Sequence, residues 1–145
     1  MTVFWCSIPP NMISGLSHIT FIARDLDRMA RIIIEVLGGE EVYDSGARTF
    51  SQSREKFFVA GGLWIAVMEG ESLPSRSYNH TAFKTDDAGL ARARIAIEKL
   101  GLEIKPPRLR VEGEAQSLYF YDHDNHLFEL HTGTLDERLV RYARG

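Results

Sequence analysis

Cysteine is nearly missing from this chain of 145 residues, since Cys6 is the only one. One thiol cannot form an intrachain disulfide, a cysteine zinc site or a redox pair, so these three classes are excluded. Excess positive charge is missing too, because a formal net charge of −3 leaves no basic surface for nucleic acid. No apolar run reaches the ~20 residues of a membrane-spanning helix, and no basic segment marks a secretory signal. These absences predict a cytoplasmic protein whose partners are neither nucleic acid nor a membrane.

The chain carries an internal duplication of sixty-odd residues. The segment from Leu16 to about Met68 and the segment from Tyr78 to about Leu130 show the same order of features. Each opens with a short β-branched and aromatic run that contains a histidine, and then enters an amphipathic stretch that ends in Leu-Gly. Three extended runs follow in each half. We therefore predict two βαβββ units.

The duplication predicts an α+β fold and a single domain. Residues 1–11 form an N-terminal extension, either an upstream start or a disordered tail, and residues 12–145 form the domain. Module 1 covers about 14–70, module 2 about 76–132, and a C-terminal tail covers 133–145. Each module buries one sheet face under its helix, so a second copy has to close the opposite face. The cleft enclosed in this way is the expected site.

Two imidazoles and one carboxylate occupy related places in the two modules. His18 and His80 open equivalent strands, and Glu129 lies on the otherwise apolar last strand, where an unpaired charge would be costly to bury. The duplicate of Glu129 is predicted at Val67 or Met68, which cannot bind a hard divalent ion. The pattern predicts a metal site with three protein ligands and open positions, as catalytic metals require. The alternative is that each histidine is an ordinary hydrogen-bonded core residue.

Three further histidines are predicted to be structural. His123 and His126 belong to a polar stretch that reads as a turn between strands. We expect His131 to point away from Glu129.

Five segments of the chain resemble a known family, namely residues 12–20, 53–58, 77–80, 110–114 and 119–122. The paired βαβββ repeat with its two histidines and one glutamate resembles the vicinal oxygen chelate superfamily, which includes glyoxalases and dioxygenases. Within this superfamily, the sequences of these segments are similar to those of the FosX-type fosfomycin epoxide hydrolases. The resemblance covers about residue 12 to the C-terminus.

This resemblance implies a reaction, a cofactor and an assembly. The fold would be an open, curved sheet cleft that a homodimer completes, with active sites shared between subunits. Mn²⁺, or another divalent metal, would be held by His18, His80 and Glu129. Glu55 would act as the general base that activates water to open the epoxide of fosfomycin, whereas its local sequence alone suggests one charge in a solvated run.

The resemblance also implies the groups that bind the phosphonate. Arg138 would supply the cation, and Thr20, Ser117 and Tyr119 would donate hydrogen bonds. Trp64 would line the pocket, although packing in the core is an equally good reading. Read locally, Arg138 is a surface charge on a helix.

One loop departs from the family pattern. Ala115 and Gln116 stand where family members tend to have a glycine and a cation, which puts efficiency towards fosfomycin in doubt. Three alternatives stay open: a thiol transferase acting on fosfomycin, a glyoxalase- or dioxygenase-type metalloenzyme, and a non-catalytic antibiotic-binding protein. Glu55 favours water over a thiol, because a thiol nucleophile needs no carboxylate base there.

Overall fold

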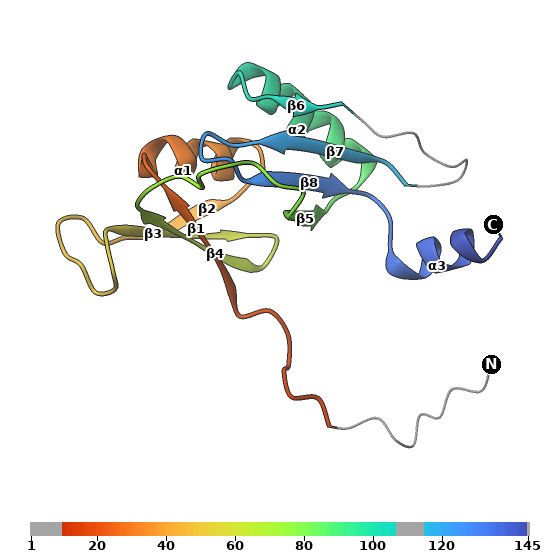
Figure 1. The fold of residues 1–145 in the computed structure, drawn as a ribbon, viewed down its shortest axis with the longest axis horizontal. Helices are drawn as coiled ribbons and strands as arrows, with labels where there is room; N and C mark the ends of the chain where they lie inside the picture. The colour runs from red at the N-terminus through yellow and green to blue at the C-terminus, as the bar shows by residue number, and fades with distance from the viewer. Residues whose placement is uncertain (1–9, 107–114, 145) are drawn as a thin grey trace.

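The structure is a computed structural model, which describes residues 10–106 and 115–144. Two four-stranded sheets carry the described chain (Figure 1), with strand orders β1-β4-β3-β2 and β5-β8-β7-β6. The elements are β1 (His18–Ala23), α1 (Leu26–Glu35), β2 (Glu40–Asp44), β3 (Glu55–Ala60), β4 (Leu63–Glu69), β5 (His80–Lys84), α2 (Asp87–Lys99), β6 (Ile104–Lys105), β7 (Ser117–Tyr121), β8 (Leu127–His131) and α3 (Leu135–Ala143). The predicted pair of βαβββ modules is confirmed.

The two long helices begin and end with the same local chemistry. The Asp25 side chain accepts from the Arg28 amide at the start of α1, and Asp86 accepts from the Gly89 amide at the start of α2. Shortly after each helix the chain turns at a glycine with a φ of 69°, a conformation that favours glycine. The helix stops predicted from the two Leu-Gly pairs are therefore confirmed.

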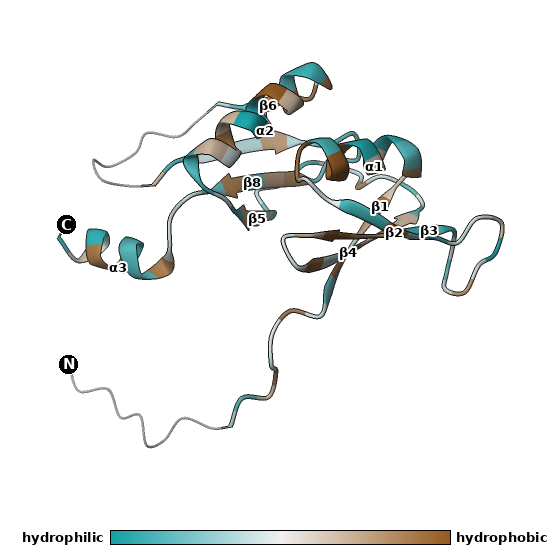
Figure 2. Cartoon of the chain, turned by 180° about the vertical axis from the view of Figure 1, so that it is seen from behind, coloured by the Kyte–Doolittle hydropathy of each residue, from teal (hydrophilic) through white to brown (hydrophobic). Residues whose placement is uncertain are grey.

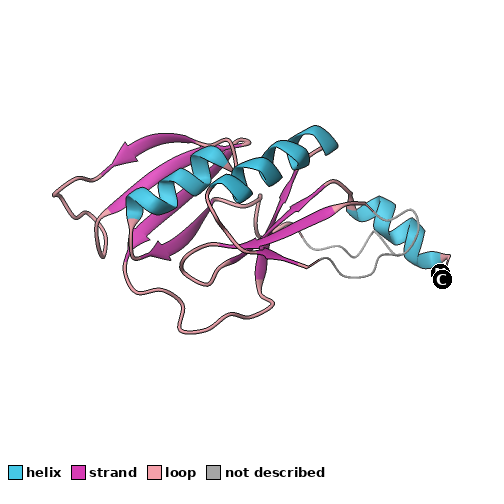
Figure 3. Cartoon of the chain, turned by 90° about the horizontal axis from the view of Figure 1, so that it is seen from above, coloured by secondary structure: helices cyan, strands magenta, loops and turns pink. Residues whose placement is uncertain are grey.

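Each sheet buries one face and leaves the other open. Figure 2 shows strongly hydrophobic stretches in β4 and β8, which are inner strands of the two sheets. One continuous core cluster joins both modules, and α1 and α2 contact each other over it, as Figure 3 shows from above. The two open faces are consequently separate surfaces in one chain, and each is half of the predicted cleft.

The modules are also joined by a buried polar turn between β7 and β8. Asp124 is 1% exposed, and its carboxylate accepts from the Arg24 amide at 3.1 Å and from the Ser72 hydroxyl at 2.6 Å. Asp122 in the same turn accepts from the amide and ring of His126. Because Arg24 and Ser72 belong to the first half of the chain, this turn fixes one module against the other.

Two segments lie apart from the sheets. Residues 10–17 and α3 extend away from the two modules in Figure 1, and no residue of α3 is buried. Along the described chain, no helix combines the length and apolar character that crossing a bilayer demands. Most of the predicted N-terminal extension and the 110–114 segment lie outside the described residues.

Candidate metal and substrate site

The open face of the second sheet gathers the predicted ligands of module 2. His80 and Glu129 lie on neighbouring parallel strands, two positions apart in the register and therefore on the same face. Their side chains converge, with His80 Nε2 3.0 Å from Glu129 Oε1. Glu129 is only 5% exposed, although it faces the open side. Two of the three predicted metal ligands are thus brought together within one chain.

The hydrogen bonds of His80 suit a cation at this place. His80 Nδ1 lies 2.8 Å from the Tyr78 carbonyl oxygen, which can only accept, so Nδ1 carries a proton. In neutral His80 the lone pair is then on Nε2, opposite a carboxylate oxygen. Two lone-pair atoms at 3.0 Å repel unless a proton or a metal ion lies between them. A backbone carbonyl that fixes the tautomer in this way is the usual support for a metal-binding histidine.

Glu129 is held in its charged form by its neighbours. Burial opposes ionisation, but hydrogen bonds from Ser117 and Tyr119 outweigh it and keep the pKa of this carboxyl below its ordinary value. The Ser117 hydroxyl donates to Oε2 at 2.6 Å, which leaves Oε1 directed at His80. Burial, together with the hydroxyl of Tyr78 and the Glu129 carboxylate, raises the pKa of Tyr119, so its phenol stays a hydrogen-bond donor.

The predicted orientation of His131 is wrong. Its ring contacts Glu129, with Nδ1 3.2 Å from Oε2, and Ser117 Oγ lies 2.6 Å from the same nitrogen. The physical reason is strand geometry, because residues two apart point to the same face. The sequence contained this signal, since Glu129 and His131 are two residues apart on one predicted strand.

His18 lies on the open face of the other sheet. Its ring packs against Trp64 at a tilt of 30°, with centroids 4.2 Å apart, and its Nδ1 lies 2.9 Å from Ser17 Oγ. Thr20 follows on the same face. No group of three His, Cys, Asp or Glu side chains that would hold a metal occurs within residues 10–106 and 115–144. One chain therefore presents the predicted ligand set in two separate parts.

The sheet registers identify the true duplicate of Glu129. His80 pairs with Leu127 and His18 with Trp64, so the residue two positions on is Glu129 in one module and Ala66 in the other. The predicted Val67 or Met68 is thus corrected to Ala66, because the offset between the last strands is one residue longer than that between the first strands. The conclusion drawn from it holds, since alanine has no metal-binding atom.

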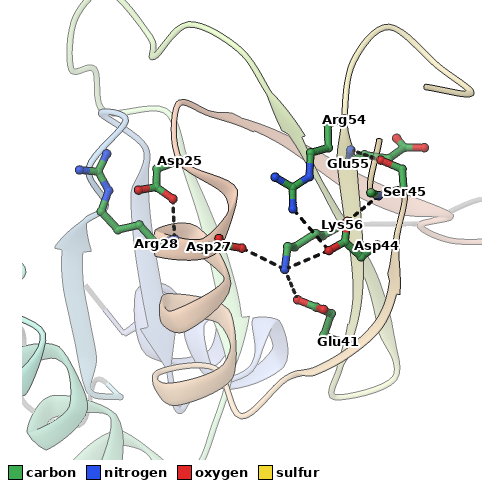
Figure 4. A network of polar contacts seen from close by, with 10 residues as sticks. Asp25, Asp27, Arg28, Glu41, Asp44, Ser45, Arg54, Glu55 and Lys56 are labelled. Atoms are coloured by element: carbon green, nitrogen blue, oxygen red, sulfur yellow. Dashed lines mark hydrogen bonds and ion pairs between the residues drawn. The ribbon is translucent and has the colours of Figure 1, made fainter. Parts of the chain in front are cut away.

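Glu55 begins β3 on the same open face as His18. It lies in register with Met68, which in turn pairs with Ile22, so it is two strands away from β1. Its backbone exchanges hydrogen bonds with Ser45 (Figure 4), and the residue is 8% exposed. The local reading of this stretch as a solvated run is wrong, because both Glu55 and Lys56 are buried.

Lys56 points to the opposite side of β3 and ties that strand to its surroundings. Its Nζ lies 2.8 Å from Glu41, 3.2 Å from Asp27 and 3.6 Å from Asp44 (Figure 4). Burial disfavours the charge, but the bonds to Glu41 and Asp27 outweigh this and raise the pKa of Lys56. The cluster joins β3 to β2 and to the first turn of α1, and so fixes the strand that carries Glu55.

The predicted phosphonate-binding residues divide between the two faces. Thr20 and Trp64, which is 39% exposed, accompany His18, while Ser117 and Tyr119 accompany Glu129. Arg138 extends from α3 to His131, with Nη2 3.3 Å from Nε2. A small cavity adjoins it, lined by Ala115, His131, Gly133, Thr134, Glu137, Arg138 and Arg141. Ala115, one of the two departures from the family pattern, therefore lies beside the predicted anion-binding arginine.

Comparison with known proteins finds similarity to one superfamily and, within it, to fosfomycin resistance proteins. The family profile of the Glyoxalase/Bleomycin resistance protein/Dioxygenase superfamily matches residues 15–130. The fosfomycin resistance protein FosX of Mesorhizobium japonicum is 61% identical over 134 residues, covering 92% of this chain and 96% of the relative.

A solved structure and a more distant relative extend this result. A glutamate-to-glutamine mutant of FosX from Listeria monocytogenes, solved with Mn(II) and 1S,2S-dihydroxypropylphosphonic acid, has a TM-score of 0.81 and 51% identity, covering 90% of this chain and 99% of that one. The metallothiol transferase FosB of Shouchella clausii is 33% identical over 138 residues, 92% of this chain and 90% of the relative.

Proposed function

This chain belongs to the Glyoxalase/Bleomycin resistance protein/Dioxygenase superfamily and, within it, to the FosX family, and from this membership we propose that it is a fosfomycin hydrolase. It opens the oxirane ring of fosfomycin with water and releases the diol, which confers resistance to the antibiotic. Manganese(II) is its cofactor. The cytoplasmic location expected from the sequence stays a prediction.

We assign the metal to His18, His80 and Glu129. The observation that carries this assignment is the convergence of His80 Nε2 and Glu129 Oε1 at 3.0 Å, with hydrogen bonds behind both that leave these two atoms as the ligand atoms. When bound, Mn(II) supplies a Lewis acid that stabilises the negative charge developing on the epoxide oxygen. The donor set of two imidazoles and one carboxylate suits such an ion.

His18 of one subunit is proposed to complete the site of its partner. β1 and β5 are edge strands of their sheets, and His18 and His80 are the first residues of these strands. Placing the β1 edge of one subunit against the β5 edge of another would bring the two histidines together and close the two open faces on each other. A homodimer then contains two such sites, each built from both subunits.

Glu55 is proposed as the base. Its carboxylate removes a proton from the water that attacks a ring carbon of the epoxide, and the carbon–oxygen bond breaks with its electron pair on oxygen. That oxygen takes up a proton from solvent to become a hydroxyl group, and Glu55 returns its proton to solvent. The open face that carries Glu55 also carries His18, Phe57 and Trp64, so the base and one metal ligand approach the substrate from the same module.

Arg138 is proposed as the cation that binds the phosphonate. A guanidinium has five donors, and only one of its nitrogen atoms is directed at His131, so donors are left for the anion. Thr20 is proposed to donate its hydroxyl proton to the same anion, and Trp64 covers the anion from module 1. The hydroxyls of Ser117 and Tyr119 donate to Glu129, so we propose that these two residues border the anion and support the metal ligand rather than donate to the phosphonate.

The test is to follow the phosphorus NMR signal of fosfomycin with metal-stripped protein, with and without Mn(II) and with and without glutathione. Conversion to the diol that requires Mn(II) and ignores glutathione is the expected result. The second candidate, suggested by the 33% identity to a metallothiol transferase, predicts a thiol adduct that forms only with glutathione. That product would overturn the proposal.

A further inference from the structure

A continuous hydrogen-bonded path joins Arg138 to Glu129 through two residues. His131 Nε2 lies 3.3 Å from Arg138 Nη2, and His131 Nδ1 lies 2.6 Å from Ser117 Oγ. Ser117 Oγ in turn lies 2.6 Å from Glu129 Oε2, which is also 3.2 Å from His131 Nδ1. The imidazole is mostly buried, with 16% of its side chain exposed. One ring therefore contacts both the supports of the metal ligand and the arginine assigned to the phosphonate.

The direction of every donor in this path follows from simple valence. A guanidinium only donates, so His131 Nε2 has to be the acceptor of the Arg138 bond. The ring proton is then on Nδ1, which donates towards Ser117 and Glu129. The Ser117 hydroxyl donates to Glu129 Oε2. All the donors point from the arginine towards the carboxylate, an arrangement in which each bond strengthens the next.

We propose that His131 is a positioning residue that sets two groups at once, the Glu129 carboxylate through its Nδ1 side and the Arg138 guanidinium through its Nε2 side. This inference rests on the proposed function, because it gives the two groups their roles. Arg138 is on α3 and Glu129 is on β8, and the His131 ring lies between them, in contact with Arg138 on one side and with Ser117 and Glu129 on the other. The ring fixes the distance between the metal end and the phosphonate end of the site.

The surrounding chain leaves room for the His131 ring between Arg138 and Glu129. A Cβ added at Gly133 would lie 2.9 Å from His131 Nε2 and 2.5 Å from the Ala115 side chain, so only glycine lets the chain pass close to the ring. One residue later, Thr134 begins α3 with a capping box to Glu137, which fixes the first turn of the helix. Arg138 follows in the next turn, so its starting point is set relative to His131.

The two sides of the ring can be tested separately. In His131→Asn the amide nitrogen takes the place of Nδ1 and the group facing Arg138 is lost. In His131→Gln the longer side chain can place its oxygen near the position of Nε2, while the donor to Ser117 is lost. Mn(II) affinity is measured on stripped protein from the electron paramagnetic resonance signal of free Mn(II). KM and kcat for fosfomycin are measured on the loaded enzyme.

We expect a split between the variants. His131→Asn should raise the fosfomycin KM about tenfold and leave the Mn(II) affinity within about twofold, since one bond to a charged group is affected. His131→Gln should weaken Mn(II) binding about tenfold, as changes behind a metal ligand commonly do. His123→Asn, the same change on an exposed part of the β7–β8 turn, should alter neither value. Combining His131→Asn with Arg138→Gln should raise KM little beyond Arg138→Gln alone, because both substitutions break the same interaction between His131 and Arg138.

The inference is overturned if both variants keep the wild-type Mn(II) affinity and KM, or if both variants change the two quantities by the same factor, as general loosening of the sheet would. Fully additive effects of His131→Asn and Arg138→Gln on KM would overturn it as well. Failure of the proposed function is distinguishable, because the wild-type protein would then consume no fosfomycin, while the Mn(II) titration still tests the path from His131 to Glu129.

Discussion

The two modules share one scaffold and differ in what they place on it. Aligned through their sheet registers, His18 matches His80, but Ala66 stands where module 2 has Glu129. The open face of module 2 therefore carries two converging residues that we propose as metal ligands, whereas that of module 1 carries one proposed ligand, His18, packed against Trp64. The two modules have equivalent strand registers, and of these two equivalent positions only the one in module 2 has a carboxylate.

The neighbouring strands show the same division. Glu55, the proposed base, matches Ser117, which donates to Glu129, and Phe57 matches Tyr119. Module 1 thus carries the proposed base beside an aromatic side chain, and module 2 carries the hydroxyls that hydrogen-bond the proposed metal ligand Glu129. Neither face alone carries the whole proposed set of residues, and this difference is what supports the proposal that a site forms where the module 1 face of one subunit meets the module 2 face of another.

Removing the feature that distinguishes module 2 should have the largest effect. Glu129→Ala deletes the buried carboxylate that faces His80, so Mn(II) binding and fosfomycin turnover should both be abolished. Binding is measured by isothermal titration with Mn(II), and turnover by phosphorus NMR. Glu69→Ala, the same change at the exposed end of β4, is the control. Wild-type Mn(II) affinity in Glu129→Ala would remove this residue from the ligand set.

Changing the distinguishing residue of module 1 should separate chemistry from metal binding. Glu55→Gln keeps the size of the side chain and removes its basicity, so kcat should fall about 10²- to 10⁴-fold, while Mn(II) affinity stays at the wild-type value. Steady-state kinetics with the metal titration decide this. Full turnover in the variant would exclude Glu55 as the base.

A mixing experiment tests whether unlike faces meet between chains. His18→Ala and Glu129→Ala should each be inactive, but a mixed dimer contains one site with both lesions and one intact site. Co-refolding the two variants in equal amounts should therefore restore about a quarter of the wild-type activity, because half of the dimers are mixed and half of their sites are intact. A mixture that stays inactive would show that no chain lends His18 to its partner.

The smallest expected effect concerns the buried faces. Lys56 on the helix side of β3 matches Leu118 in module 2, and the lysine is surrounded by three carboxylates. Lys56→Leu should lower the free energy of unfolding by about 1 kcal/mol, since these carboxylates are partly exposed. Chemical denaturation measures it, and Leu118→Ala gives a purely apolar loss for comparison.

The raised pKa of Lys56 also predicts how its contribution to the free energy of unfolding changes with pH. Because the pKa of Lys56 is raised in the folded protein, its stabilisation is complete below the unfolded lysine value of about 10.4 and is lost as the pH rises through the folded-state value. The difference in stability between wild type and Lys56→Leu should therefore shrink at alkaline pH, where Lys56 loses its charge, and at acid pH, where Asp27, Glu41 and Asp44 are protonated. An equal difference at every pH would mean that the charge of Lys56 contributes nothing.

Local patterns in the sequence determined the elements and their order. The helix caps at Asp25 and Asp86 and the glycine stops act within a few residues, so they can be read without the fold. The duplication located the two histidines at equivalent strand starts for the same reason. Strand alternation also contained the contact between Glu129 and His131, because it depends on a spacing of two alone.

Tertiary structure decided what depends on register and on distant partners. Only the pairing of β1 with β4 and of β5 with β8 identifies Ala66 as the counterpart of Glu129, because a shift of one residue moves a side chain to the other face. The burial of Glu55 and Lys56 depends on β2 and α1, which no local pattern places against β3. The sequence by itself determined which groups can bind a metal, since chemistry belongs to the residue, and the fold decided that one chain holds them on two separate faces.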